Sequence, residues 1–249
     1  MLLSVAIITK NEEDRLPKTL EAVKDIADEI VVVDSGSTDR TVEIAKKFGA
    51  KVFIEEWKGY GAQKQSALQK CKGEWILFLD ADEVIDKDLK EEIKRVIQKQ
   101  EAVGYKIRRR TVYLGKPLKF LWNNEYLLRL VRKDANPKWV GNIHEKLSVG
   151  GKVRTLKRGT IYHYTYRSLK EHYLKSIKYA ELTAEERYIR GKKPSLVRFF
   201  LSPLWAFFKA YLLKGGILEG RRGFLIAFSY ALNSLLKEGF LWERHIRQK

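Results

Sequence analysis

The chain has 249 residues, of which 45% are hydrophobic and 32% charged, so it can fold around a core and is not a disordered segment. Its single cysteine, Cys71, excludes a disulfide framework and fits a reducing compartment, and we interpret Cys71 as structural. The net charge of +18 is uneven, with −3 on residues 1–100 and +21 on residues 101–249, which indicates an anionic partner for the second part.

The first hundred residues alternate short strands and helices. The apolar N-terminal stretch has no basic leader of the kind that precedes a secretory signal, and it is short enough to be a buried strand. Ser37 and Thr38 are expected to cap the second helix. Strands are expected at 4–9, 29–34, 51–55 and 75–80, and helices at 18–26, 39–48, 59–72 and 87–100. This alternation predicts an α/β fold with a mostly parallel sheet and helices on both faces.

From Gly104 the pattern changes. Short basic strands are expected at 105–110, 126–132 and 147–149, and a long amphipathic helix at 168–190. Residues 196–242 are rich in Phe, Leu, Trp and Gly. We therefore divide the chain into residues 1–100, residues 101–166 and a helical, basic and aromatic C-terminal appendage at 167–249.

Acidic residues stand at the ends of two predicted strands. Asp34 ends the strand 29–34, and Asp80 ends the strand 75–80 and is followed by Ala81 and Asp82. Ligands of doubly wound sheets bind at the carboxyl ends of the strands. Carboxylates spaced like Asp80 and Asp82 suit Mg²⁺ or Mn²⁺, which keep open positions for substrate phosphates. The alternative is that these aspartates only form turns and cap helices.

Four motifs in this order resemble the family 2 glycosyltransferases, which have the Rossmann-like GT-A fold. The motifs are Thr9-Lys10-Asn11-Glu12, Asp34-Ser35-Gly36-Ser37-Thr38-Asp39, Gly59…Gln63-Lys64 and Asp80-Ala81-Asp82-Glu83. Two later segments, 139–145 and 163–166, resemble more specifically the lipopolysaccharide-core β-1,4-glucosyltransferases that act on inner-core heptose. The resemblance implies that residues 1–100 form the nucleotide-sugar-binding half of the GT-A domain and residues 101–166 its acceptor-binding half.

The resemblance also implies a role for each matched residue. Asp34 would accept the uracil N–H, Lys64 would lie near the phosphates, and Asp82 would bind the metal ion. Asp80 would face the ribose or the metal, and His163 would either complete the metal site or be an ordinary hydrogen-bonded histidine. A departure from the family is Gln65, where asparagine is common. The full set implied for the nucleotide sugar is Thr9, Asn11, Glu12, Asp34, Ser35, Ser37, Asp39, Lys64, Asp80 and Ala81.

Transfer of a sugar also needs a base that takes the proton of the acceptor hydroxyl. We choose Glu145, which lies beyond the nucleotide-binding half; the alternative is that it forms an ion pair with Arg129 or Arg132. Trp139 could stack on the acceptor sugar, and His144 could orient Glu145, contact a phosphate or be inert. One base and no candidate nucleophile predict inversion at the anomeric carbon.

The C-terminal appendage contains two apolar runs, at 199–208 and 224–236, bordered by lysine and arginine. Each run is shorter than the ~20 residues of a spanning helix. Apolar faces with cationic borders fit helices that lie in the surface of an anionic membrane. The alternative is a helical hairpin, turning at 215–220, that packs on the rest of the chain or forms a homodimer.

These observations predict a metal-dependent hexosyltransferase in the cytoplasm, peripheral on the inner face of the membrane. Its partners would be a nucleotide-sugar donor, most simply UDP-glucose, and an anionic lipid-linked acceptor such as lipopolysaccharide inner core. One alternative is a nucleotidyltransferase acting on a sugar phosphate, but the segment after the first strand lacks that class's glycine-rich loop. The other is a basic nucleic-acid-binding module, but no nucleic-acid motif is present, and we expect no nucleic-acid partner.

Overall fold

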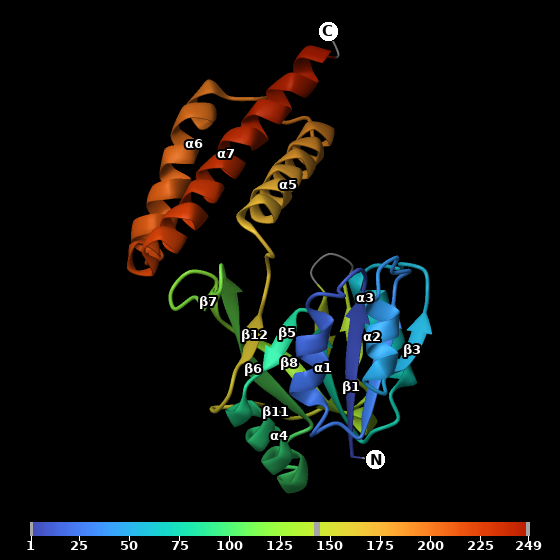
Figure 1. The fold of residues 1–249 in the computed structure, drawn as a ribbon. Helices are drawn as coiled ribbons and strands as arrows, with labels where there is room; N and C mark the ends of the chain where they lie inside the picture. Colours follow the sequence, from blue (N-terminus) through green and yellow to red (C-terminus); the bar gives the residue numbers. More distant parts are fainter. Residues whose placement is uncertain (1, 142–144, 248–249) are drawn as a thin grey trace. The chain divides into compact units, whose positions relative to one another are not determined.

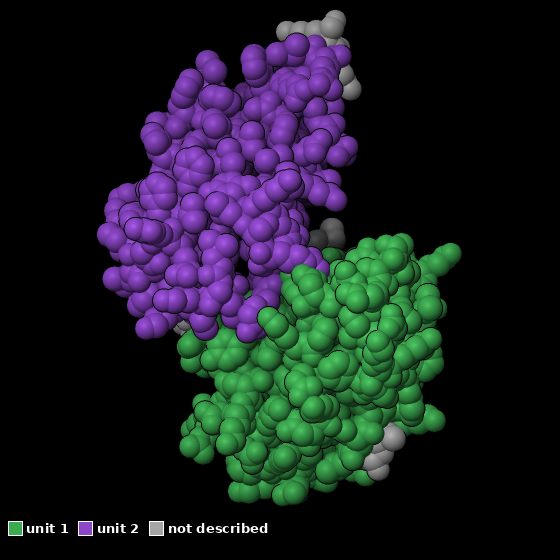
Figure 2. All heavy atoms as spheres, in the orientation of Figure 1, with its two compact units in different colours: residues 1–110, 124–163 green, residues 111–123, 164–249 purple. Residues whose placement is uncertain are grey.

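The structure is a computed structural model and describes residues 2–141 and 145–247. The chain forms two compact units, which Figure 2 shows in different colours. Unit 1 comprises residues 1–110 and 124–163, and unit 2 comprises residues 111–123 and 164–249. The second unit is therefore built from the C-terminal region together with a short excursion from the middle of the chain.

The elements follow each other as Figure 1 shows. The strands are β1 (Leu3–Thr9), β2 (Glu29–Asp34), β3 (Lys51–Ile54), β4 (Trp75–Asp80), β5 (Glu83–Ile85), β6 (Gly104–Tyr113), β7 (Lys116–Pro117), β8 (Asn123–Arg132), β9 (Lys138–Val140), β10 (Lys146–Ser148), β11 (Val153–Thr155) and β12 (Ile161–His163). The helices are α1 (Leu16–Val23), α2 (Thr41–Lys47), α3 (Tyr60–Lys70), α4 (Lys87–Lys99), α5 (Leu169–Ile189), α6 (Leu196–Phe208) and α7 (Arg221–Arg247).

The main sheet has the strand order β3-β2-β1-β4-β8-β6-β12-β5. Strands β3, β2, β1 and β4 are parallel, whereas β8 joins β4 antiparallel and β12 joins β5 antiparallel. The predicted parallel sheet is thus confirmed for the first four strands. Beyond β4 the sheet is mixed, because these antiparallel pairs stand beside β11, which pairs parallel with β6.

Alternate residues of the central strands enter two separate cores, as expected for a sheet covered on both faces. One core joins Val5, Leu77 and their neighbours to apolar residues of α1, α2 and α4. The other joins Ala6, Phe78 and their neighbours to Ala67, Leu68 and Cys71 at the end of α3. Burial raises the pKa of the Cys71 thiol to about 12, so this side chain is an inert part of the core.

Unit 2 is helical, with α5 and α6 both packed on α7. The buried Glu238 of α7 accepts hydrogen bonds from Arg187 of α5 (2.6 Å) and from the backbone N–H of Ser195 (3.3 Å), so one carboxylate ties the three helices together. His172 is buried and lies 2.7 Å from the Tyr113 hydroxyl, and burial lowers its pKa to about 4, so the ring is neutral at physiological pH.

Two expectations from the sequence need correction. Ser37 and Thr38 do not cap α2, because the Ser37 hydroxyl is hydrogen-bonded to Asp34, and the N–H of Thr41 is instead bound by Asp39 (3.0 Å). The first apolar run is not confined to ten residues either. Helix α6 continues as a π-helical turn, Lys209–Leu213, and the segment Leu196–Leu213 is the one helix of the described residues long and apolar enough to cross a membrane.

Gly159 determines how closely the chain before β12 can approach α4. Its φ is +81°, and a Cβ atom at this position would lie 2.3 Å from Leu89 Cα and 2.4 Å from Leu89 N. Gly49 has a similar φ of +76°, but nothing lies within 4 Å of the position of its Cβ. The two glycines therefore share the same backbone conformation and differ in the space around them.

We expect Gly159→Ala to lower the free energy of unfolding by about 3 kcal/mol, because backbone strain and overpacking add. Gly49→Ala is the matched control and should lose only the strain, about 1 kcal/mol. Urea denaturation of both variants measures the difference. If both variants lose the same free energy of unfolding, the close approach to α4 is not the reason for the glycine at position 159.

Candidate functional site

Asp80, at the carboxyl end of β4, lies between two cations. Its Oδ1 is 3.0 Å from Lys64 Nζ, and its Oδ2 is 3.0 Å from Arg129 Nη2. Residues 76, 78 and 80 of β4 point to the α3 side of the sheet, which is why a lysine of α3 reaches Asp80. Although burial acts to raise it, Arg129 and Lys64 hold the pKa of Asp80 well below its usual range.

Glu83, at the start of β5, extends this network. It is fully buried, its Oε1 accepts hydrogen bonds from Arg129 (2.9 Å) and Arg109 (3.3 Å), and its Oε2 accepts the backbone N–H of Asp80 (3.0 Å). Buried charges are tolerated when they are paired and hydrogen-bonded, and here each carboxylate has at least one guanidinium partner. The network fixes the turn between β4 and β5, on which Ala81 and Asp82 lie.

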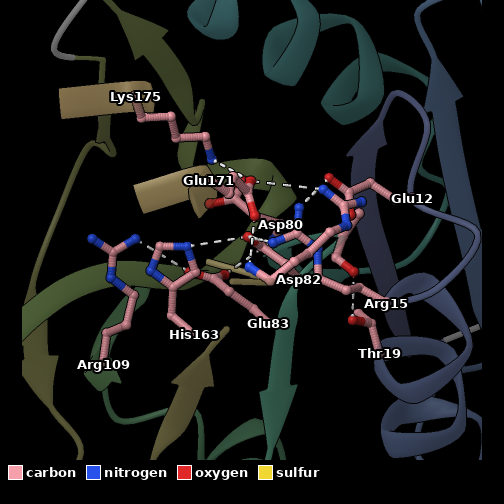
Figure 3. Close-up of polar contacts among 12 residues, drawn as sticks. Glu12, Arg15, Thr19, Asp80, Asp82, Glu83, Arg109, His163, Glu171 and Lys175 are labelled. Atoms are coloured by element: carbon pink, nitrogen blue, oxygen red, sulfur yellow. Dashed lines mark hydrogen bonds and ion pairs between the residues drawn. The ribbon is translucent and has the colours of Figure 1, made fainter. Parts of the chain in front are cut away.

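Asp82 points away from Asp80 towards a different pair of residues. Its Oδ2 is 3.3 Å from Arg15 Nη1 and 3.4 Å from His163 Nε2. His163 reaches it because β12 pairs with β5 so that His163 is opposite Glu83. Burial lowers the pKa of His163, but the hydrogen bond to Asp82 outweighs burial and raises this pKa above its usual value. Figure 3 shows this arrangement of Asp80, Asp82, Glu83, Arg15 and His163.

The three residues predicted to bind a metal ion are therefore not equivalent. Asp82 and His163 place a carboxylate oxygen and an imidazole nitrogen side by side, a combination that suits a divalent transition ion. Both oxygens of Asp80 are instead engaged by cations. Within residues 2–141 and 145–247, no group of three His, Cys, Asp or Glu side chains is placed to hold a metal. The described residues thus offer two adjoining ligands, and the others would come from a ligand's oxygens.

The second predicted cluster lies two strands away from Asp80. In the sheet register Thr9 is opposite Asp34 and Ile8 is opposite Asp80, which separates the two aspartates by two strand spacings, about 10 Å. Asp34 is fully buried and accepts hydrogen bonds from Gly36 N (3.0 Å), Ser37 N (2.8 Å) and Ser37 Oγ (2.5 Å). The turn-forming interpretation of Asp34 is therefore realised, while one of its roughly four acceptor positions remains.

The loop after β1 is held against the loop after β2. Asn11, in the left-handed region at φ +54°, donates its N–H to Ser37 Oγ (2.8 Å) and accepts the N–H of Thr38 (2.8 Å). The Glu12 N–H binds Thr41 Oγ1 (2.8 Å). Burial raises the pKa of Asp39, but hydrogen bonds from Thr41 outweigh burial and lower it. The loops thus form one hydrogen-bonded rim, in which the buried hydroxyls of Thr9 and Ser35 have no described partner.

Glu145 lies on the other side of Asp80. Its Oε1 is 3.0 Å from Lys64 Nζ, so Lys64 bridges Asp80 and Glu145, and it also lies 4.9 Å above the Trp139 ring. The ion pair of Glu145 is therefore with Lys64, whereas Arg129 binds Asp80 and Glu83, and Arg132 binds Asp134. Gln65 helps to hold β9 in place, because its side-chain oxygen accepts a hydrogen bond from the backbone N–H of Trp139 (2.9 Å). His144 lies outside the described residues.

An open cavity of about 710 Å³ adjoins Glu145, and we call it the β8 cavity. Its lining is Lys64, Asp80, Lys106, Arg109, Glu125, Tyr126, Leu127, Leu128, Arg129, Trp139, Glu145, Lys146 and Leu147. The site thus has two parts, a hydrogen-bonded rim at β1 and β2 and a charged cavity at β8, and Asp80, which lines the cavity, lies two strands from Asp34 of the rim.

The sequence pattern missed the residues that hold this site in place. Glu83, Arg109 and Arg129 were not predicted as site residues, and neither was Arg15, the cation beside Asp82. The arginines of β6 and β8 stand in basic strands without a motif, and their partners Asp80 and Glu83 lie 26 to 49 residues away in the sequence. The one available signal was Glu83 itself, which continues the Asp80-Ala81-Asp82 motif.

Residues 4–150 match the model of the family described as Glycosyl transferase family 2. An "Uncharacterized glycosyltransferase" of Rickettsia bellii (strain RML369-C) is 33% identical over 94% of this chain and 84% of its own length. The "Lipopolysaccharide core biosynthesis glycosyltransferase LpsC" of Rhizobium meliloti (strain 1021) is 32% identical over 98% of this chain and 93% of its own length. These similarities extend well beyond the first hundred residues.

Among solved structures, S. aureus TarS 1–349 is similar with a TM-score of 0.51 and 18% identity, covering 100% of this chain and 92% of that chain. At this identity the likeness bears on the fold alone. Together with the family match, it confirms the predicted GT-A fold with a helical C-terminal region.

Glu83 and Glu125 both bind Arg109, but the side chain of Glu83 is 0% exposed and that of Glu125 is 58% exposed. We expect Glu83→Gln to lower the free energy of unfolding by about 3 kcal/mol, because it leaves the buried guanidinium of Arg129 and the partly buried one of Arg109 short of a counter-charge. The matched control Glu125→Gln should cost less than about 1 kcal/mol. Urea titrations test this, and equal costs would mean that the buried network does not stabilise unit 1.

Proposed function

The chain belongs to glycosyl transferase family 2, and from this premise we propose that it is an inverting hexosyltransferase. It takes glucose from UDP-glucose and transfers it to a lipid-anchored glycan, the inner core of lipopolysaccharide. The single observation that carries the acceptor class is the similarity to LpsC, whose name places it in lipopolysaccharide core biosynthesis and which matches this chain almost end to end.

The rim at β1 and β2 supports a uridine nucleotide as the donor. Buried polar groups are nearly always hydrogen-bonded, yet the Thr9 and Ser35 hydroxyls have no partner in the described part of the chain. Their strands place them beside Asp34, which retains acceptor capacity for a ring N–H. The TarS 1–349 protein has been solved in complex with UDP, and it shares this fold with a TM-score of 0.51.

The residues of the site divide the work of transfer between them. Glu145 removes the proton of the acceptor hydroxyl, whose oxygen then attacks the anomeric carbon as the bond from that carbon to the diphosphate oxygen breaks. UDP leaves with the bonding electron pair, and the configuration at the anomeric carbon is inverted. Lys64, now 3.0 Å from Glu145, would turn to the diphosphate when the donor binds, which would free Glu145 to act as the base.

Asp82 and His163 would hold a divalent ion, Mg²⁺ or Mn²⁺, because they are the adjoining pair of suitable ligands. When bound, such an ion supplies electrostatic stabilisation for the leaving diphosphate. Asp80, held by Lys64 and Arg129, serves as the anchor that orients Asp82 and faces the donor ribose.

We expect UDP together with Mn²⁺ to raise the melting temperature of the protein, because a ligand that binds only the folded state stabilises it. Asp82→Asn should remove the part of the shift that depends on the metal, and Asp34→Asn should weaken UDP with or without metal. A thermal-shift screen over nucleotides and ions measures both effects. If no uridine nucleotide shifts the wild-type protein, the proposed donor is wrong.

Glu145→Gln should lower kcat by about 10² to 10⁴ fold, because the variant lacks the base that accepts the hydroxyl proton. UDP release with isolated lipopolysaccharide core as acceptor measures the rate. The affinity for UDP should be retained, which controls for folding. A variant that turns over at the wild-type rate would remove Glu145 from the mechanism.

We also propose that unit 2 binds an anionic membrane on the cytoplasmic side. Helix α6 supports this, because in the segment Leu196–Leu213 only 6% of the residues are buried within the protein. Leu196, Leu204 and Trp205 are 77%, 69% and 56% exposed. Lys209 lies within this segment and Lys214 and Arg221 follow it in the sequence, as expected for contact with anionic lipid.

Leu204→Glu should strongly reduce co-sedimentation with phosphatidylglycerol vesicles, because a carboxylate opposes both apolar burial and anionic lipid. The control is Leu182→Glu, the same change at a 50% exposed position of α5, which should have a small effect. We expect 1 M salt to release the protein from the vesicles if its binding is peripheral, because at this ionic strength the Debye length is only about 3 Å and charge attraction to the lipid is screened. If instead Leu204→Glu splits a homodimer and leaves vesicle binding intact, the apolar surface is a subunit interface.

A further inference from the structure

Three buried N–H groups around the β8 cavity have no hydrogen-bond acceptor among the described residues. They are Nε and Nη1 of Arg129 and Nε1 of Trp139, and both residues line the cavity. Arg129 is only 3% exposed and uses Nη2 alone for its two bonds to Asp80 and Glu83. Since buried donors in proteins are nearly always paired, these groups indicate a ligand that brings acceptor oxygens.

The charge of the cavity indicates which oxygens these are. Five cations line it, against three carboxylates. Lys64 and Arg109 are engaged by carboxylates, but Lys106 of β6 and Lys146 of β10 form no ion pair with any residue in the described ranges. A partly desolvated guanidinium with two unused donors and two unpaired ammonium groups favours an oxyanion over a neutral hydroxyl.

The position of the cavity indicates that this oxyanion belongs to the acceptor substrate and not to the nucleotide-sugar donor. The donor rim lies at β1 and β2, while the cavity lies across β4 at β6, β8 and β10. Glu145 lines the cavity directly, so an acceptor held there would present its hydroxyl to the base. Lys106 and Lys146 come from strands that take no part in the rim, which distinguishes them from Lys64, the cation expected near the donor phosphates.

We propose that the β8 cavity is the acceptor subsite and that it recognises an oxyanion, a phosphate or a carboxylate, carried by the acceptor sugar. Arg129 supplies the buried donors, and Lys106 and Lys146 select for negative charge at the entrance. This assignment rests on the proposed glycosyl transfer, because it names the site at which the second substrate binds. It makes charge on the acceptor a determinant of specificity.

Binding of small sugars to the UDP-saturated protein tests the assignment. The probes are glucose 6-phosphate, glucuronate and glucose, measured by isothermal titration calorimetry, so that phosphate, carboxylate and neutral sugar are compared. The variant is Lys106→Gln/Lys146→Gln, two exposed positions whose change should not disturb folding. The matched control is Lys46→Gln/Lys72→Gln, which removes the same charge from exposed positions outside the cavity.

We expect at least one charged sugar to bind about tenfold more tightly than glucose, and the Lys106→Gln/Lys146→Gln variant to lose about tenfold for it. The control should remain within about twofold of the wild type. Preference for glucose 6-phosphate would identify a phosphorylated acceptor, and preference for glucuronate a carboxylated one. Arg129→Lys, which keeps the charge but loses the planar donors, should weaken the same probe if it folds.

The inference is overturned if glucose binds as tightly as both charged sugars. It is also overturned if the cavity variant and the control lose affinity equally, because the charge effect is then long-range. Failure of the proposed function looks different, since UDP would not bind to any of these proteins. If a charged sugar binds in the absence of UDP binding, and this binding depends on Lys106 and Lys146, the proposed acceptor subsite is retained and the proposed UDP-sugar donor is rejected.

Discussion

The pairing of four charged side chains between β4, β5, β6 and β8, of which Glu83 and Arg129 are buried, is the constraint on which the site depends. Asp80 and Glu83 are held by Arg129 and Arg109, and Lys64 joins Asp80 from the α3 side. Each charge is tolerable only because its partner is present, so the network fixes the distances between elements that the apolar core alone would leave adjustable. The turn that carries Asp82 and the lysine that contacts Glu145 both depend on it.

The sequence was sufficient to predict the parallel part of the sheet. The strands ending at Asp34 and Asp80 lie where they were predicted, because fully apolar runs bounded by turn residues leave little choice in a sheet covered on both faces. Alternating helices and strands also predicted which edge of the sheet collects the aspartates. These signals are local, and the register of β1 with β2 and β4 follows from them.

The partners of these residues could not be predicted in the same way. Arg129 reaches Asp80 only because β8 returns antiparallel to β4, and nothing in a basic strand of mixed pattern specifies that pairing. The Ser37 cap failed because a nearby buried carboxylate, Asp34, competes for the same hydroxyl. The first apolar run concealed a longer helical segment, Leu196–Leu213, because Lys209 interrupts the apolar pattern without ending the helix. In each case a tertiary contact or a continuous backbone overrode the local signal.

The central claim is that the rim at Asp34 and the turn at Asp82 hold one sugar diphosphate between them. The sheet register separates Asp34 from Asp80, the residue just before that turn, by two strand spacings, about 10 Å, which is within the span of a nucleotide diphosphate. A crystal structure with UDP and Mn²⁺ tests the claim most directly. The account predicts uracil beside Asp34, the diphosphate beside Asp82, and Lys64 moved from Glu145 to a phosphate oxygen. Density for UDP away from both aspartates, with the Lys64–Glu145 pair intact, would contradict it.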